Sequence, residues 1–262
     1  MNLTHSALAA DVDIAGVDGC KAGWIAVVKW RDEPLSVRVC GSFSDILAGL
    51  AEDAIIAVDM PIGLPAFTRH GGRGPEVLVR RFLGQRQSSV FSISSRAAVY
   101  AADEPFTTLE RWYEAHRIAS GVARETSNPP RGVSIQAFGI FSKIRELDRL
   151  MRVRPELRVR VIESHPEVAF WRLNGEQAMS LPKKIKGRIN PTGMAERKAL
   201  LAANGLERAF LDAPPPRGAG DDDFLDAAAM LLIAGRLARG EARSFPDPPE
   251  SDEYGIPVAI RA

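Results

Sequence analysis

Residues 14–30 read IAGVDGCKAGWIAVVKW, and the fold can be worked out from this stretch. Two runs rich in Val, Ile and Trp, 14–18 and 24–30, flank a glycine-bounded turn at 19–23. This is the pattern of a β-hairpin. A third run of the same kind follows at 35–41. The sequence therefore predicts two consecutive hairpins.

Two further runs are expected to form strands that end on an acid. Residues 54–58 are unbroken apolar and lead into Asp59. The pattern predicts a buried central strand. Residues 158–163 repeat it, because their apolar positions lead into Glu163. Two strands that lie far apart in the sequence are thus predicted to end on carboxylates.

Helices are predicted before and after these strands. Ser44 is suited to cap a helix that continues through Ala51. Three acids, 221–223, open a longer helix that runs to about Ala238, where the helix dipole favours negative charge. We expect Asp222 to be the N-cap of this helix.

The region 60–157 differs in composition from the rest, since helical patches are broken there by Gly and Pro. We interpret it as a mainly helical insertion, with helices at about 110–124 and 140–153. Residues 254–261 alternate in polarity and are expected to form an edge strand. Because no internal repeat is visible, the pattern favours a single domain over residues 12–261.

The composition limits the class of protein. Of 262 residues, 34 are Lys or Arg and 33 are Asp or Glu, so the net charge of +1 excludes a protein that coats nucleic acid by charge alone. Cys20 and Cys40 lack metal-ligand spacing, which argues against a disulfide scaffold or zinc ribbon and favours a cytoplasmic location. No Lys or Arg precedes the short apolar stretch in 1–12, and the longest apolar run, 227–235, is too short to span a bilayer. We expect neither a targeting signal nor a membrane partner.

Acids at the ends of predicted elements indicate a metal site. Open α/β sheets bind ligands at the carboxyl ends of their strands, and acids at i and i+3 of a helix share a face. Such carboxylates repel one another unless cations lie among them, and oxygen ligands suit Mg²⁺ or Mn²⁺. Two such ions can promote phosphodiester hydrolysis. The candidate metal ligands are Asp18, Asp59, Glu163, Asp223 and Asp226. Each acid taken alone also fits a structural cap or turn.

Several motifs together resemble a domain-of-unknown-function family whose members are described as predicted RNase H-like nucleases. The motifs lie at 15–24, 57–64, 88–91, 134–138, 143–146, 163–168 and 222–228. The resemblance implies an RNase H-like mixed five-stranded sheet with helices on both faces, as in Holliday-junction resolvases, and a large helical insertion between strands 4 and 5. It also implies a metal-dependent nuclease, a hydrolase, with Asp18, Asp59, Asp223 and Asp226 as the catalytic residues.

Basic and hydroxyl side chains are candidates for binding the phosphates of DNA or RNA. Arginines are frequent between Asp59 and Tyr100, and their guanidinium groups match phosphate geometry. The alternative is a solvated helix face whose arginines pair with acids elsewhere. The candidate substrate-binding residues are Lys21, Arg86, Ser88, Ser89 and Arg96.

Two other functions are compatible with the sequence. The Gly-x-Asp-Gly turn at 16–19 also begins ATP-binding phosphotransferases of the sugar-kinase and actin-like type, but those need a second lobe, and only one set of sheet motifs is present. A non-catalytic nucleic-acid-binding module is the other alternative. Convergence of Asp18, Asp59 and Asp226 is the test of the metal-site hypothesis. The sequence does not indicate an oligomeric state.

Overall fold

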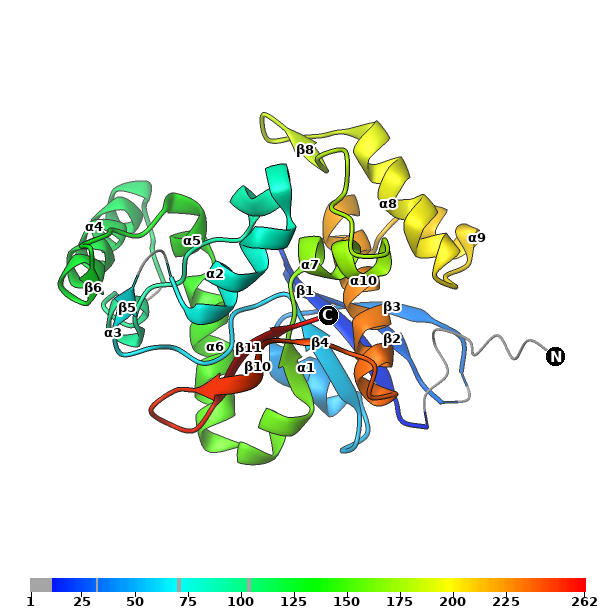
Figure 1. Ribbon diagram of the computed structural model, residues 1–262, viewed down its shortest axis with the longest axis horizontal. Helices are drawn as coiled ribbons and strands as arrows, with labels where there is room; N and C mark the ends of the chain where they lie inside the picture. Colours follow the sequence, from blue (N-terminus) through cyan, green and yellow to red (C-terminus); the bar gives the residue numbers. More distant parts are fainter. Residues whose placement is uncertain (1–10, 32, 70–71, 103–104) are drawn as a thin grey trace.

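A mixed five-stranded sheet forms the centre of the molecule (Figure 1). The computed structural model describes residues 11–31, 33–69, 72–102 and 105–262. The strands of the sheet are β1 (Ile14–Cys20), β2 (Gly23–Lys29), β3 (Ser36–Cys40), β4 (Ile55–Val58) and β7 (Val161–Glu163), in the spatial order β3-β2-β1-β4-β7. β2 is antiparallel to β1 and β3, whereas β4 is parallel to β1 and β7. The expected α/β fold is confirmed.

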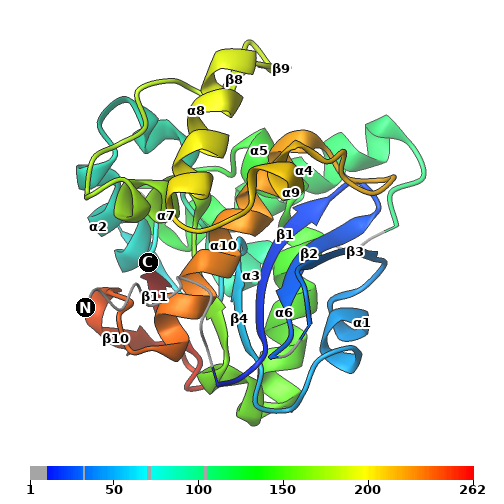
Figure 2. The ribbon, with the colours of Figure 1, turned by 90° about the vertical axis from the view of Figure 1, so that its right-hand side faces the viewer.

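Helices cover both faces of this sheet (Figure 2). α10 (Asp221–Ala238) packs on one face, where α7 (Pro166–Leu173) and α8 (Pro191–Ala203) contribute to the same apolar core. α1 (Phe43–Ala48) and α6 (Phe141–Val153) contribute to a second core on the other face. Strand side chains alternate between the two cores. Ile14 lies in the α10 core and Ala15 and Val17 in the other, so Asp18 faces the α10 side.

Gly16 brings the backbones of β1 and α10 into direct contact. A Cβ atom at this position would lie 2.0 Å from the backbone nitrogen of Leu231 and 2.1 Å from the carbonyl oxygen of Ala227. No side chain fits in that space, so only glycine allows this approach. The close packing holds the first turns of α10 beside the carboxyl end of β1.

Between β4 and β7 the chain is mainly helical. Its elements are β5 (Thr68–Arg69), α2 (Gly74–Val79), α3 (Arg96–Val99), α4 (Leu109–Glu125), β6 (Ser127–Asn128), α5 (Ile135–Gly139) and α6, with 3-10 turns at Arg80–Phe82, Gly84–Ser89 and Pro155–Val159. β5 and β6 form a small parallel pair. In Figure 1 this segment lies beside the carboxyl end of the sheet, where it walls one side of the candidate site.

The remaining elements follow β7. They are the hairpin of β8 (Lys184–Ile185) and β9 (Arg188–Ile189), α9 (Arg208–Asp212), and the antiparallel pair of β10 (Ser244–Ser251) and β11 (Pro257–Arg261). The expected edge strand at 254–261 thus pairs with β10 in a separate sheet. In the part of the chain that the structure describes, no helix has the length and apolar character needed to cross a membrane. Residues 1–10, which bear on the expected lack of a targeting signal, lie outside the described residues.

Two local predictions were wrong. Ser42, not Ser44, caps α1, because its hydroxyl accepts from the Asp45 N–H while the Asp45 carboxylate accepts from the Ser42 N–H. Residues 158–160 are not part of a strand. Pro155 begins a 3-10 turn that runs to Val159, and the strand starts only at Val161, where pairing with Ile56 of β4 becomes possible.

Candidate metal centre

Three carboxylates meet at the carboxyl end of the sheet. Asp18 lies in β1, Asp59 follows β4, and Asp226 lies in the second turn of α10. One oxygen from each lies within 4.8 Å of the others. This agrees with the expected convergence, and it follows from the topology, because β1 and β4 are parallel neighbours and Gly16 holds α10 against β1. We call Asp18, Asp59 and Asp226 the acidic centre.

Burial and mutual repulsion raise the pKa values of the acidic centre. The pKa of Asp18 is raised well above its usual value by burial and then by the charges of Asp59 and Asp226. Burial also raises the pKa of Asp59 to about 7 and that of Asp226 to about 6, even though Lys183 opposes both shifts. The site therefore disfavours its own negative charge, as expected of carboxylates that lack enough cations.

Lys183 places an ammonium group against the acidic centre. Its Nζ donates to Asp226 Oδ2, and the side chain is 29% exposed. Burial alone would lower the pKa of Lys183, but the charges of Asp226 and Asp18 outweigh it and raise the pKa. The ammonium supplies one positive charge to three carboxylates, so it offsets the repulsion only in part.

The start of α10 corrects two predicted roles. Gly220, not Asp222, is the N-cap, since Gly220 has the extended backbone of a cap and the helix therefore begins at Asp221. This puts Asp223 at the third position of the helix, where its Oδ2 accepts from the Gly220 N–H at 2.9 Å. Asp222 instead pairs with Lys184 at 2.5 Å. One oxygen of Asp223, which was expected to bind a metal, is therefore engaged in capping the helix.

Glu163 lies close to the centre but is engaged by an arginine. Arg73 Nη2 lies 2.5 Å from Glu163 Oε1 and Arg73 Nη1 lies 3.0 Å from Oε2, which also accepts from the Ile62 N–H at 2.7 Å. Glu76 binds the same guanidinium at 2.6 Å. Both oxygens of Glu163, a predicted metal ligand, therefore have cationic or N–H partners, and Glu163 is not part of the acidic centre.

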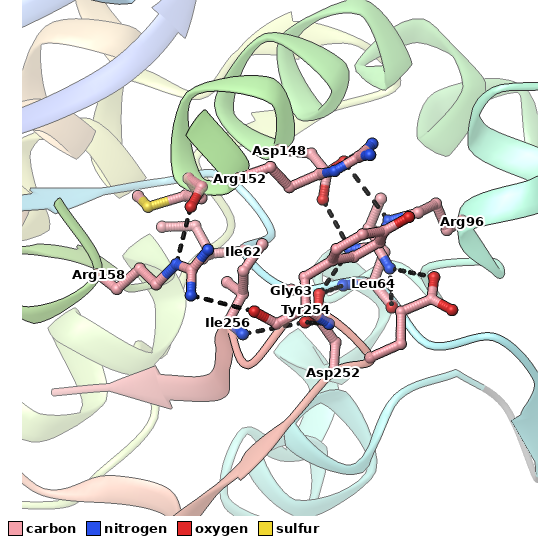
Figure 3. Close-up of polar contacts among 12 residues, drawn as sticks. Ile62, Gly63, Leu64, Arg96, Asp148, Arg152, Arg158, Asp252, Tyr254 and Ile256 are labelled. Carbon is pink, nitrogen blue, oxygen red and sulfur yellow. Dashed lines mark hydrogen bonds and ion pairs between the residues drawn. The ribbon is translucent and has the colours of Figure 1, made fainter. Parts of the chain in front are cut away.

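Arg96 was a candidate phosphate-binding residue, but the structure shows it in an ion-pair network (Figure 3). Its guanidinium contacts Asp148 at 2.8 Å, Asp252 at 2.5 Å and Glu253 at 2.6 Å. The Tyr254 ring centroid lies 4.5 Å from its Cζ atom. Its donors are thus engaged within this network, and Arg96 does not line the cavity described next.

A cavity of about 400 Å³ opens at the acidic centre. Two of the predicted substrate-binding residues, Ser88 and Ser89, line it together with Asp18 and Asp59, whereas Lys21 and Arg86 do not. Other lining residues were not predicted. They are Lys143, Lys183, His165, Glu167 and apolar side chains that include Met60, Val90, Phe91, Ile93 and Ile140. The cavity thus combines a carboxylate floor, basic side chains and a largely apolar wall.

The donor set of the acidic centre fits a divalent cation. Its ligand atoms are all carboxylate oxygens, which Mg²⁺ and Mn²⁺ prefer. Asp226 is 1% exposed, and its Oδ1 has no hydrogen-bond partner among the described residues. A buried polar atom without a partner is rare in folded proteins unless an ion or water completes it. The site therefore has both the ligand type and a free buried ligand atom.

Comparison with known families matches residues 16–251 to the family described as "Protein of unknown function (DUF429)". The match covers most of the chain, and the protein belongs to this family. Comparison with curated proteins and with solved structures gives no significant match.

Proposed function

We propose that this protein is an RNase H-like, metal-dependent nuclease that hydrolyses phosphodiester bonds in nucleic acid. The observation that carries the proposal is the convergence of Asp18, Asp59 and Asp226 to within 4.8 Å of one another. These acids come from the first strand, the adjacent parallel strand and the helix packed on them. The RNase H-like family that the sequence resembles implies acids at these positions.

The acidic centre would hold Mg²⁺ or Mn²⁺. Such ions supply Lewis-acid activation of water and of the phosphoryl group. The protein's own contribution is to fix the ligands: Asp18 Oδ1 accepts from the Gly19 N–H at 2.6 Å, which orients its carboxylate. Raised pKa values at Asp18, Asp59 and Asp226 show that the metal-free site resists charge, so a bound cation would relieve the repulsion.

The size of the cavity favours a flexible single strand of nucleic acid as the substrate. About 400 Å³ is at the small end of ligand-pocket sizes and far below the volume of a double helix. One nucleotide of a single strand could enter it, with the phosphate at the acidic centre and the base against the apolar wall. Lys143, whose ammonium lies 5.2 Å from the Trp24 ring centroid, lines the same cavity and is suited to meet a phosphate.

A cleavage assay tests the proposal. Fluorescent single-stranded and duplex oligonucleotides of DNA and RNA would be incubated with Mg²⁺, Mn²⁺ or EDTA. We expect metal-dependent cleavage that prefers single strands and that falls about a thousandfold in Asp18→Asn. Asp53→Asn is the matched control, because Asp53 pairs with Arg31 on the surface, and this variant should cleave like the wild type.

The outcomes separate the rival functions. Failure of the wild type to cleave any of these substrates with either metal would overturn the nuclease proposal. Binding of the oligonucleotides without cleavage would favour a non-catalytic nucleic-acid-binding module. A shift in melting temperature with ATP but not with oligonucleotides would favour a phosphotransferase.

A further inference from the structure

Glu167 is a carboxylate near the acidic centre that sequence reasoning did not select. It lies in the first turn of α7, which starts directly after β7. His165 is the N-cap, and its Nδ1 accepts from the Glu167 N–H at 3.2 Å, while Pro166 occupies the first helical position. The cap and the proline fix the backbone here, so the direction of the Glu167 side chain is set by the helix start.

One oxygen of Glu167 is held and the other is free. Oε1 accepts from Arg197 Nη2 at 2.6 Å, and Arg197 is fully buried and also donates to the carbonyls of Leu181 and Gly193. Oε2 has no hydrogen-bond partner among the described residues, although Glu167 is only 5% exposed. Leaving a buried oxygen unsatisfied destabilises the folded protein, and the cost is greater for a charged group. A ligand that binds this oxygen would remove the cost, so an unpartnered buried oxygen is typical of a binding site.

The free oxygen belongs to a side chain in the same cavity as the acidic centre. Glu167, Asp18, Asp59 and Lys183 all line that cavity. Glu167 therefore places a buried, unpartnered carboxylate oxygen on a side chain that shares a cavity with two members of the acidic centre.

Other acids around the site differ from Glu167 in their partners or in their burial. Glu163 is bound by Arg73 and Asp222 by Lys184. Asp223, like Glu167, has one oxygen with a partner, the Gly220 N–H, but its side chain is only half-buried. In the described part of the chain, the buried carboxylate oxygens that lack a partner are those of Glu167 and Asp226. Glu167 and Asp226 thus each have a buried oxygen that is available to a cation. This indicates that the site can bind more cations than Asp18, Asp59 and Asp226 would hold by themselves.

We propose that Glu167, and not Asp223, is the fourth carboxylate of this centre and provides a ligand to a second divalent cation. The proposal rests on the proposed function, because it assumes that the acidic centre binds a first cation. Arg197 then acts as the positioning residue: it holds Oε1 and leaves Oε2 available. The two acids of the segment 163–167 then have different roles. Glu167 binds the second cation, whereas Glu163 pairs with Arg73.

Metal stoichiometry tests this assignment without reference to catalysis. The full chain would be titrated with Mn²⁺ by calorimetry, and the bound ions examined by electron paramagnetic resonance for coupling between neighbouring Mn²⁺ ions. We expect two equivalents and a coupled spectrum for the wild type. Glu167→Gln should lose the second equivalent, or bind it at least about tenfold more weakly, and should lose the coupling. The glutamine carbonyl can still accept from Arg197, so the contact with α8 is kept.

Asp223→Asn is the matched control, since the asparagine oxygen can still accept from the Gly220 N–H. It should bind two equivalents like the wild type. A purely structural role for Glu167 would leave the stoichiometry and the coupling unchanged in Glu167→Gln, and that result would overturn the proposal. So would a single equivalent in the wild type, or loss of the second equivalent in Asp223→Asn. Absence of any Mn²⁺ binding by the wild type would instead overturn the proposed function itself.

Discussion

Two clusters of acids in the described part of the molecule differ in how their charge is balanced. In the Arg96 network, formed by Arg96, Asp148, Asp252 and Glu253, one guanidinium binds three carboxylates (Figure 3). Tyr100 and Arg152 also contact Asp148. In the acidic centre, three carboxylates share one ammonium, and a buried oxygen of Asp226 has no hydrogen-bond partner among the described residues.

The difference shows how buried acids can be sorted by role. The acids of the Arg96 network are held by several directional hydrogen bonds, which is what a structural cluster needs to offset desolvation. The acidic centre keeps its carboxylates in mutual repulsion, and their pKa values rise accordingly. This repulsion lowers the stability of the folded protein unless a cationic ligand binds. Burial alone therefore does not set the acidic centre apart from the Arg96 network, whereas the shortage of donors does.

Removal of Arg96 should have the largest effect on stability. Arg96→Met leaves Asp148 and Asp252 buried with fewer partners; their side chains are 2% and 0% exposed. Breaking a buried ion pair by removing one partner costs about 3 to 5 kcal/mol. Urea denaturation should show a loss of this size, with cleavage per folded molecule unchanged. Arg96→Lys should recover part of the loss, and equal stability of Arg96→Met and wild type would contradict the structural role.

Neutralising Asp18 should act in the opposite direction. In EDTA at pH 8, Asp18→Asn should raise the free energy of unfolding, because a repelling buried charge is removed. The asparagine oxygen can still accept from the Gly19 N–H. A marked loss of stability in this variant would show that Asp18 has a structural role like the acids of the Arg96 network.

Lys183 should compete with a divalent cation. Lys183→Met removes the ammonium from Asp226, so Mn²⁺ should bind about tenfold more tightly by calorimetry, a change of about 1.4 kcal/mol. Lys184→Met is the matched control. Lys184 is 43% exposed and pairs with Asp222, and loss of an exposed pair changes little.

A labelling experiment sharpens this prediction. If Mn²⁺ displaces the ammonium, reaction of Lys183 with an amine-modifying reagent should increase when the metal is added, while that of Lys184 stays constant. Weaker Mn²⁺ binding by Lys183→Met would mean that the lysine supports the metal site rather than competing with it.

The smallest expected effect is a pH dependence of the metal-free protein. Burial raises the folded-state pKa of Asp59 to about 7, so the folded state binds protons more tightly than the unfolded state. Its contribution to stability is therefore present at low pH, falls as the pH rises from about 4 to about 7, and levels off above 7. Denaturation in EDTA between pH 5 and pH 8 should show a decline in the free energy of unfolding that is reduced in Asp59→Asn. Equal slopes for the two proteins would contradict the raised pKa.

Much of the fold could be predicted from local patterns. The glycine-bounded turn after Asp18 and the apolar runs around it predict the hairpin, and two strands that end in acids predict where those acids lie. The predicted helix over 221–238 has the observed bounds, because acids mark its start and Gly240 follows its end. These signals depend on neighbours in the sequence, so they can be read without knowing the tertiary contacts.

The partners of the charged groups could not be predicted in this way. Glu163 ends a strand as Asp59 does, yet Arg73, ninety positions away, binds it. Lys183 reaches Asp226 from an irregular segment, and the basic run over 183–188 that it begins is also typical of an exposed loop. Glu167 resembles any acid in the first turn of a helix, and only the missing partner of its Oε2 sets it apart. Whether an acid pairs with an arginine or is left for a ligand is decided by tertiary packing.

The contact between Gly16 and α10 also bears on the order in which the protein is made. β1 leaves the ribosome well before Ala227 and Leu231, the residues that pack on Gly16. Until then one face of the growing sheet lacks its cover, and Asp18 and Asp59 lie without Asp226. An incomplete chain thus has no complete acidic centre, and its uncovered apolar strands are the surface that chaperones bind. The centre forms only when the last long helix docks.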